Sequence, residues 1–101
     1  MPMQYEVRVA RAAQNDIDNI VDYIARELEN PIAAVNMADS IVDEIQSLSH
    51  MPKRYRVYPR EPWKSMKTRF LPIKNFIIMF RVDDTSKIVG ILRVFYGRQD
   101  I

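Results

Sequence analysis

The spacing of apolar residues changes near residue 50 of this chain of 101 residues, from the period of a helix to the period of a strand. Between residues 11 and 50 the apolar side chains recur three or four positions apart, which predicts amphipathic helices. From residue 54 onward they alternate with a period of two, which predicts β-strands. Helices that precede a run of strands favour an α+β fold, in which a helical hairpin packs on one face of a small, mostly antiparallel sheet.

The helical half is predicted to form two helices joined by a short turn. The first runs roughly from Arg11 to Glu29, and its apolar stripe comprises Ile17, Ile20, Val21, Ile24 and Leu28. Asn30-Pro31 separates the helices, because asparagine is a good N-cap and proline at the first helical position loses only an N–H group that would be unpaired anyway. The second helix ends before Met51-Pro52, and its apolar stripe comprises Ala34, Met37, Ala38, Ile41, Ile45 and Leu48. Helices connected so closely are expected to lie antiparallel.

The strands begin before the helices and resume after them. Tyr5–Val9 alternates between apolar and polar residues and is the predicted opening strand. Arg54–Tyr58 is a possible short strand, and Asp83–Ser86 has the composition of a hairpin turn. Three consecutive strands are predicted at 67–73, 75–82 and 87–96. The expected order is therefore β-α-α-β-β-β, with one further short strand possible.

The last two predicted strands are apolar on both faces, which is expected for strands in the middle of a sheet. Strict alternation in the last strand places Ile88, Leu92, Val94 and Tyr96 on one face. It places Val89, Ile91, Arg93 and Phe95 on the other. A helical hairpin can cover only one face, so the other face, which is expected to be concave and to carry arginines, must hold something else.

Composition limits the kinds of site that the chain can form. Its length fits a single domain over residues 1–101. The sequence has no cysteine and one histidine, so no disulfide, metal site or cofactor is expected. No apolar run approaches the ~18 residues of a membrane span, and the N-terminus lacks the apolar core of a signal peptide. We therefore expect a soluble, cytoplasmic protein.

Charge divides the chain into two halves of opposite sign. Residues 1–50 contain three Lys/Arg against nine Asp/Glu, a formal charge of −6. Residues 51–101 contain twelve Lys/Arg against four Asp/Glu, a formal charge of +8. The acidic residues of the first half, Asp16 among them, are expected on the solvated faces of the helices. The basic half indicates an acidic partner, either a nucleic acid or an acidic protein.

The residues that could carry chemistry lie in the basic half. They are Trp63, Lys67, Arg69, Lys74, Arg81, Arg93, Tyr96 and Arg98. Cleavage of RNA by its own 2′-hydroxyl requires removal of a proton, stabilisation of charge on the phosphorane and protonation of the leaving oxygen. Arginines suit the second task, and a tyrosine can move a proton only where neighbouring cations lower its pKa. Any one of these residues could instead keep a sheet edge soluble.

Several segments of the sequence resemble the RelE/ParE toxin superfamily. They are the run AAQNDIDNIVDYI from residue 12, Asn30-Pro31, the run SLSHMP from residue 47 and the run RFLPIKNFIIMFRVD from residue 69. The ending ILRVFYGRQD from residue 91 is the most specific of them. The similarity extends over nearly the whole chain. It implies the toxin of a type II toxin–antitoxin system, held inactive by a cognate antitoxin that is encoded by an adjacent gene and joins it in a hetero-oligomer.

The superfamily divides into two mechanisms, and the resemblance assigns candidate residues accordingly. RelE-like toxins cut mRNA on the ribosome without a metal, and the corresponding catalytic residues here would be Arg69, Arg81, Tyr96 and Arg98. Lys67, Lys74, Arg93 and Trp63 would then bind nucleic acid. ParE-like toxins instead inhibit DNA gyrase and lack this set. The sequence departs from the RelE pattern in two ways, because Ile77 replaces an arginine of that pattern and no tyrosine stands at the C-terminus.

Three hypotheses follow from these residues. The first is a ribosome-dependent endoribonuclease, and the second is a non-enzymatic gyrase inhibitor, towards which the long first helix leans. The third is a non-toxic module on the same scaffold that binds nucleic acid or protein. Fold alone does not separate them, since function depends on the site.

Overall fold

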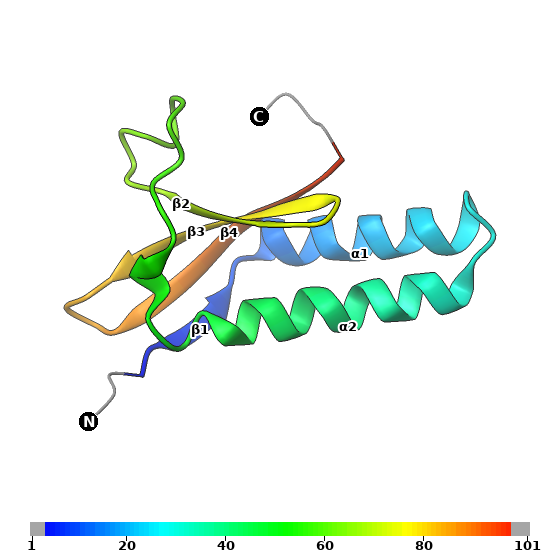
Figure 1. Ribbon diagram of the computed structural model, residues 1–101, viewed down its shortest axis with the longest axis horizontal. Helices are drawn as coiled ribbons and strands as arrows, with labels where there is room; N and C mark the ends of the chain where they lie inside the picture. Colours follow the sequence, from blue (N-terminus) through cyan, green and yellow to red (C-terminus); the bar gives the residue numbers. More distant parts are fainter. Residues whose placement is uncertain (1–3, 98–101) are drawn as a thin grey trace.

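Two helices cover one face of a four-stranded sheet in the computed structural model, which describes residues 4–97 (Figure 1). The elements are β1 (Glu6–Val9), α1 (Arg11–Arg26), α2 (Pro31–Ser47), the 3-10 turn η1 (Pro52–Arg54), β2 (Arg69–Ile73), β3 (Phe76–Asp83) and β4 (Ile88–Tyr96). The predicted α+β layout and the helical hairpin are confirmed. Neither helix of the described chain has the length and apolar character needed to cross a membrane.

The strands lie in the order β1-β4-β3-β2. The pairs β2–β3 and β3–β4 are antiparallel, whereas β1 lies parallel to β4 at one edge. At the other edge, residues 56–58 run alongside the start of β2, where the N–H of Tyr58 donates to the carbonyl of Thr68 at 2.8 Å. The possible short strand at 54–58 is therefore reduced to a single bridge between Val57 and Arg69.

The predicted junction between the helices is confirmed. The side chain of Asn30 accepts a hydrogen bond from the N–H of Ala33 at 3.1 Å, and Pro31 begins α2. Leu28 was expected in the buried stripe of α1, and this prediction is wrong, because its side chain is 54% exposed. The helix ends at Arg26, and Glu29 turns the chain with a φ of 48°, so the helical period no longer applies at Leu28.

A β-bulge in β4 corrects the predicted faces of this strand. The register runs from Phe80 opposite Ile91 to Met79 opposite Arg93, so Leu92 is an extra residue with no partner of its own on β3. Strict alternation would place the residues before the bulge and those after it on opposite faces. Because of the extra residue, they share a face. Those packed on the helices are Val89, Ile91, Val94 and Tyr96. We call this side of the sheet the helix face and the opposite side the outer face.

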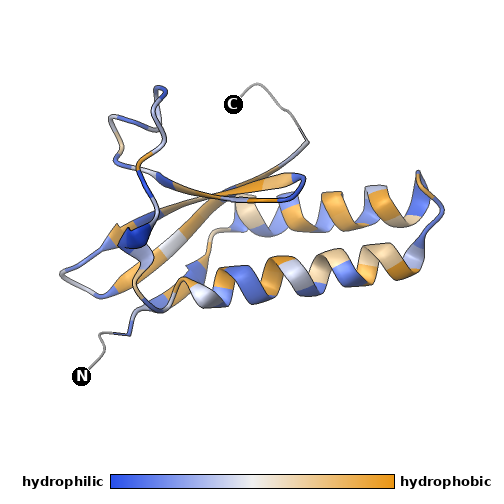
Figure 2. Ribbon diagram, in the orientation of Figure 1, coloured by the Kyte–Doolittle hydropathy of each residue, from blue (hydrophilic) through white to orange (hydrophobic). Residues whose placement is uncertain are grey.

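Apolar residues follow β3 and β4 along most of their length (Figure 2). On the helix face, Phe76, Ile78 and Phe80 are at most 2% exposed and pack against α1 and α2. On the outer face, Met79 is also fully buried. Tyr58 and Phe70 meet edge to face on that side, at 5.1 Å between ring centroids. The outer face is thus partly covered by the segment between η1 and β2.

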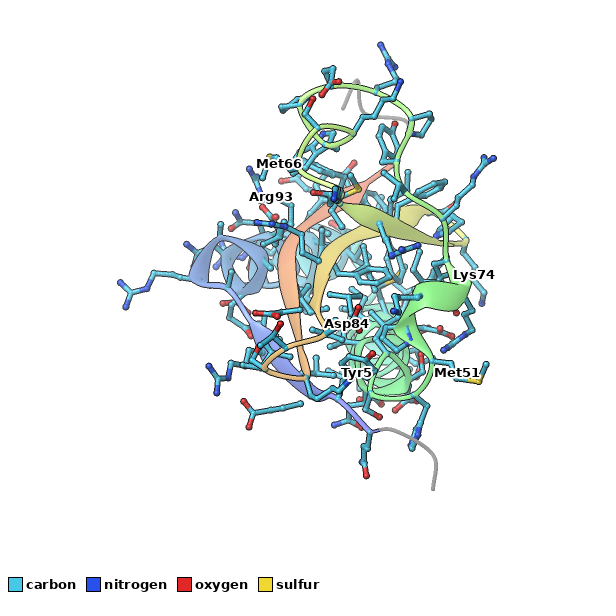
Figure 3. The ribbon with its side chains drawn as sticks, turned by 90° about the vertical axis from the view of Figure 1, so that its left-hand side faces the viewer. Tyr5, Met51, Met66, Lys74, Asp84 and Arg93 are labelled. Carbon is cyan, nitrogen blue, oxygen red and sulfur yellow. The ribbon has the colours of Figure 1, made fainter. Side chains whose placement is uncertain are left out.

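Asp84, in the turn between β3 and β4, ties three parts of the fold together. Its carboxylate accepts a hydrogen bond from the hydroxyl of Tyr5 at 2.6 Å and pairs with the ammonium of Lys53 at 2.9 Å (Figure 3). Tyr5 precedes β1, and Lys53 lies in η1. These two bonds lower the pKa of Asp84, chiefly the one from Tyr5, and raise the pKa values of Tyr5 and Lys53.

The Asp84 contacts predict a pH-dependent contribution to stability. Because folding lowers the pKa of Asp84, its contribution is fully present above the ordinary aspartate value of about 3.9. It is lost as pH falls through the lowered folded value. Asp84→Asn should therefore unfold more readily than wild type near neutral pH, and the difference should shrink below about pH 4. Urea unfolding at a series of pH values measures this effect. Asp39→Asn, at an exposed position of α2, is the control, and a difference for Asp84→Asn that is equal at all pH values would contradict the account.

Candidate functional site

The candidate residues lie on both faces of the sheet. Directly paired residues share a face, so Arg69 opposite Phe80 and Tyr96 opposite Phe76 belong to the helix face. Arg81 is opposite Gly90 and Arg93 is opposite Met79, and these pairs belong to the outer face. Arg98 lies outside the described residues. The four proposed catalytic residues therefore do not share one face in the part of the chain that is described.

Arg69 and Tyr96 are both engaged in packing on the helix face. The guanidinium of Arg69 donates to the carbonyl of Tyr55 at 2.7 Å and so holds the 56–58 segment against β2. The ring of Tyr96 lies against that of Tyr23 on α1, at 6.2 Å between centroids. Each side chain thus joins β2 or β4 to a neighbouring segment.

Arg93 is bound by an aspartate of α1 (Figure 3). Both oxygens of the Asp16 carboxylate accept hydrogen bonds from its guanidinium, at 2.7 and 3.0 Å. One of them also accepts the N–H of Val94 at 2.9 Å. The carboxylate raises the pKa of Arg93 above its ordinary value through the hydrogen bond. The prediction that Asp16 lies on a solvated helix surface is wrong, because its side chain is only 15% exposed.

Asp16 occupies this position because β1 is shorter than β4. Pairing between the two strands ends with Val9 opposite Ile91, so the edge of β4 beyond that point has no strand beside it. Helix α1 starts two residues after β1 and runs past this edge, where the carboxylate replaces a strand as acceptor for Val94. The sequence does carry a signal for this burial, because Asp16 comes three residues after Ala13 and four before Ile20, both buried.

An open pocket of about 310 Å³ lies between α1 and the end of β4. It is lined by Asp16, Asn19, Ile20, Arg93, Val94, Phe95 and Tyr96. The pocket thus brings together Arg93 and Tyr96, two of the predicted site residues. Its arginine is already paired with a carboxylate, so the positive charge that it offers to an anionic ligand is largely neutralised.

The other predicted nucleic-acid ligands are dispersed. Trp63 packs on Phe95, with their rings edge to face at 6.0 Å, and the guanidinium of Arg93 lies 5.2 Å from the same phenylalanine ring. Lys67 and Lys74 are exposed, and their φ angles of 56° and 41° place them in turns at either end of β2. Trp63 and Arg93 are therefore close together, whereas the two lysines are separated by the length of a strand.

Arg81 differs from the other arginines of the sheet. It is exposed on the outer face of β3, and it makes no ion pair or hydrogen bond within residues 4–97. Over the same residues there is no cluster of three or more side chains able to hold a metal ion. Of the described candidate arginines, Arg81 is thus unpaired, Arg69 is bonded to a backbone carbonyl and Arg93 is paired with Asp16.

Comparison with known protein families identifies the family of this chain. The model of the ParE toxin of the type II toxin–antitoxin system parDE matches residues 7–101. The chain belongs to the ParE toxin family. It is accordingly a toxin of a type II toxin–antitoxin system.

Two solved structures resemble this ParE-family chain along almost its whole length. A chain of the chromosomal ParDE toxin–antitoxin system from P. aeruginosa is 25% identical, with a TM-score of 0.76, and the match covers 95% of this chain and 99% of that one. A chain of the RelBE2 toxin–antitoxin complex from Mycobacterium tuberculosis is 22% identical, with a TM-score of 0.67, and the match covers 96% and 95%. The second likeness shows the shared fold alone. No curated protein matches the sequence.

The Asp16 contacts predict a stability role for this carboxylate in the ParE-family scaffold. Asp16→Ala leaves the half-buried Arg93 and the N–H of Val94 without their acceptor. The free energy of unfolding should therefore fall by roughly 1–3 kcal/mol. Asp18→Ala is the matched control, because Asp18 is exposed and bonds only Gln14 on its own helix. It should change stability by less than about 0.5 kcal/mol. Urea unfolding compares the two, and equal stabilities would show that the Asp16 bonds contribute nothing.

Proposed function

We propose that this ParE-family toxin arrests growth by binding DNA gyrase and does not cut RNA. The main support is the distribution of the four candidate catalytic residues. Cleavage needs its groups arranged around one phosphate, with hydrogen-bond donors about 3 Å from the atoms that gain charge. Arg69 and Tyr96 belong to the helix face and Arg81 to the outer face, so these three do not surround a common point.

The contacts of the individual residues support the same proposal. The Arg69 guanidinium already donates to the Tyr55 carbonyl, and that of Arg93 is paired with Asp16. Using either arginine to stabilise a phosphorane would require breaking a contact that holds two segments of the fold together. A binding inhibitor needs no such rearrangement. Its affinity depends on the shape and charge of a rigid surface.

A second candidate function is ribosome-dependent, metal-independent cleavage of mRNA. The pocket between α1 and β4 favours it, because Arg93 and Tyr96 line the same cavity and Trp63 lies against Phe95 beside it. Aromatic side chains stack on unpaired bases in RNA-binding proteins. In this alternative Arg98, which follows directly after Gly97, would supply the charge that Arg93 does not.

A cognate antitoxin, encoded by the adjacent gene, is the proposed partner in either case. The solved relatives are named as toxin–antitoxin systems, and the basic second half of this chain suits an acidic segment of such a partner. A hetero-oligomer that blocks the target-binding surface would keep the toxin inactive. Both proposed targets lie in the cytoplasm, where the toxin would act.

Expression in bacteria tests the toxin function directly. Induction of this chain alone should arrest growth, and co-expression of the adjacent small gene should restore it, because the antitoxin covers the surface that binds the target. Growth curves and viable counts measure the effect, with the level of soluble protein as the control. Normal growth at a high soluble level would favour the third hypothesis, a non-toxic binding module.

Two assays run in parallel separate the mechanisms. The purified toxin should inhibit supercoiling of plasmid DNA by gyrase and leave ribosome-bound mRNA intact. Arg98→Ala and Tyr96→Phe are the informative variants, because they remove a charge and a hydroxyl group. If the toxin is a ribonuclease, Arg98→Ala should reduce cleavage roughly 30- to 1000-fold. Codon-spaced cuts in mRNA that disappear in these variants, together with unaffected supercoiling, would overturn the gyrase proposal.

A further inference from the structure

The positive charge of this chain is concentrated in one segment. Residues 53–74 contain eight Lys/Arg and one Asp/Glu, a formal charge of +7. Residues 75–101 contain four Lys/Arg and three Asp/Glu, a formal charge of +1. The basic character of the second half of the chain therefore comes almost entirely from residues 53–74, which we call the basic segment.

The basic segment leads from η1 to the end of β2, and much of it projects from the sheet, away from α1 and α2 (Figure 1). Backbone turns hold the projection in shape. The N–H of Lys64 donates to the carbonyl of Arg60 at 3.0 Å, and that of Thr68 donates to the carbonyl of Trp63 at 2.9 Å. The two helices belong to residues 1–50, which carry a formal charge of −6. This separation of charge orients a large anion so that it meets the basic segment first.

The aromatic side chains of the basic segment are used in packing on the sheet. Tyr55, Tyr58 and Trp63 are half-buried, and each meets a phenylalanine of a strand edge to face, at 5.1 to 6.1 Å between ring centroids. Proteins that bind single-stranded nucleic acid present aromatic rings on which the bases stack. Because these rings face the sheet instead, the segment is suited to a nucleic acid whose bases are paired and whose phosphates are exposed.

The cations of the segment that remain available are mainly lysines. Lys64, Lys67 and Lys74 are exposed and make no hydrogen bond or ion pair within residues 4–97. Arg56 is also exposed, and its guanidinium lies over the ring of Phe70 at 5.4 Å, a contact that involves no carboxylate or carbonyl. These four side chains can pair with phosphates without breaking a polar contact of the fold.

The spacing of these cations suits an extended polyanion better than a single small anion. Lys67 and Lys74 lie at either end of β2, whose five residues span roughly 17 Å. Duplex DNA carries about one negative charge per 1.7 Å of its axis, so it presents phosphates over the whole of that distance. The one carboxylate of the segment, on Glu61, accepts the N–H of Ser65 at 2.9 Å and is thus held against the backbone of its own turn.

We propose that the basic segment binds the phosphate backbone of duplex DNA, so that this toxin contacts the DNA on which gyrase acts as well as the enzyme. An acidic peptide is a poorer occupant, because peptides also need apolar contacts. Met66 is the one large apolar side chain that the segment exposes within the described chain. The contact with DNA held by gyrase rests on the gyrase inhibition proposed above, whereas binding to free duplex is measured without gyrase.

Binding to free DNA is the first test. The full-length toxin should bind a fluorescein-labelled duplex of about 20 base pairs, and the logarithm of its association constant should fall with the logarithm of the salt concentration with a slope of about −3 to −4. This slope corresponds to about four neutralised phosphates. Fluorescence anisotropy at a series of KCl concentrations measures it. Absence of binding at low salt, or tighter binding of a single-stranded RNA of the same length, would overturn the proposal.

A charge-removing variant assigns the binding to the basic segment. Lys64→Gln combined with Lys67→Gln should weaken duplex binding about tenfold or more and make the slope shallower by about 2. Arg11→Gln combined with Arg26→Gln is the matched control, because it removes the same charge from two exposed positions of α1. The control should bind within about twofold of wild type, and circular dichroism checks that both variants are folded. Equal weakening in the two would mean that DNA responds to net charge alone, which contradicts the assignment.

The supercoiling assay connects the segment with gyrase. The Lys64→Gln, Lys67→Gln variant should require about fivefold or more toxin for half-inhibition, yet bind DNA-free gyrase as wild type does in isothermal titration calorimetry. Inhibition of gyrase by wild-type toxin that binds no duplex would overturn the basic-segment proposal and leave the gyrase proposal intact. Duplex binding by a toxin that does not inhibit gyrase would overturn the gyrase proposal instead. Normal duplex binding by the variant, with weakened binding of the antitoxin, would assign the segment to the antitoxin and overturn its role in DNA binding.

Discussion

The β-bulge at Leu92 determines which side chains of β4 are buried against the helices and which lie on the outer face of the sheet. With strict alternation, a strand that buries Val89 and Ile91 against the helices would point Val94 and Tyr96 to the opposite side. The bulge at Leu92 restores all four to the helix face, so that one strand supplies the core along its whole length. It also sets Arg93 on the outer face with Met79. The faces of Arg93 and Tyr96 therefore follow from this single irregularity, whereas Arg69 and Arg81 take theirs from the regular pairing of β3 with β2 and with the first half of β4.

The bulge lies where β4 loses its neighbour, and the Asp16 contacts compensate for that loss. A strand edge with free N–H groups can pair with another chain, and proteins commonly protect such edges. Here one carboxylate satisfies the Val94 N–H and the Arg93 guanidinium together. The arginine that the bulge turns outward is thereby fixed against α1. This contact makes Arg93 part of the scaffold. Arg81, by contrast, is the arginine of the sheet that has no polar partner in the described chain.

Local patterns were sufficient to predict most of the architecture. The helical stripe of α2 and the Asn30 cap depend on residues within one or two turns, which the sequence displays directly. The bulge could not be predicted in this way, because both alternating readings of β4 are apolar and only pairing with β3 selects between them. Leu28 was misplaced because the period of a helix does not show where the helix ends. Asp16 was misplaced because acidic residues are usually solvated, although its spacing from Ala13 and Ile20 indicated the buried side.

The candidate site was less predictable than the fold, for a related reason. The sequence shows that a basic residue on a predicted strand must point to one of the two faces of the sheet. Whether that residue is free to bind a ligand depends on contacts from segments distant in the sequence. Arg69 illustrates this, since its guanidinium bonds the carbonyl of Tyr55, fourteen residues earlier in the chain. Relatives that share this scaffold can therefore differ in activity through which arginines are bound internally and which remain available to a partner.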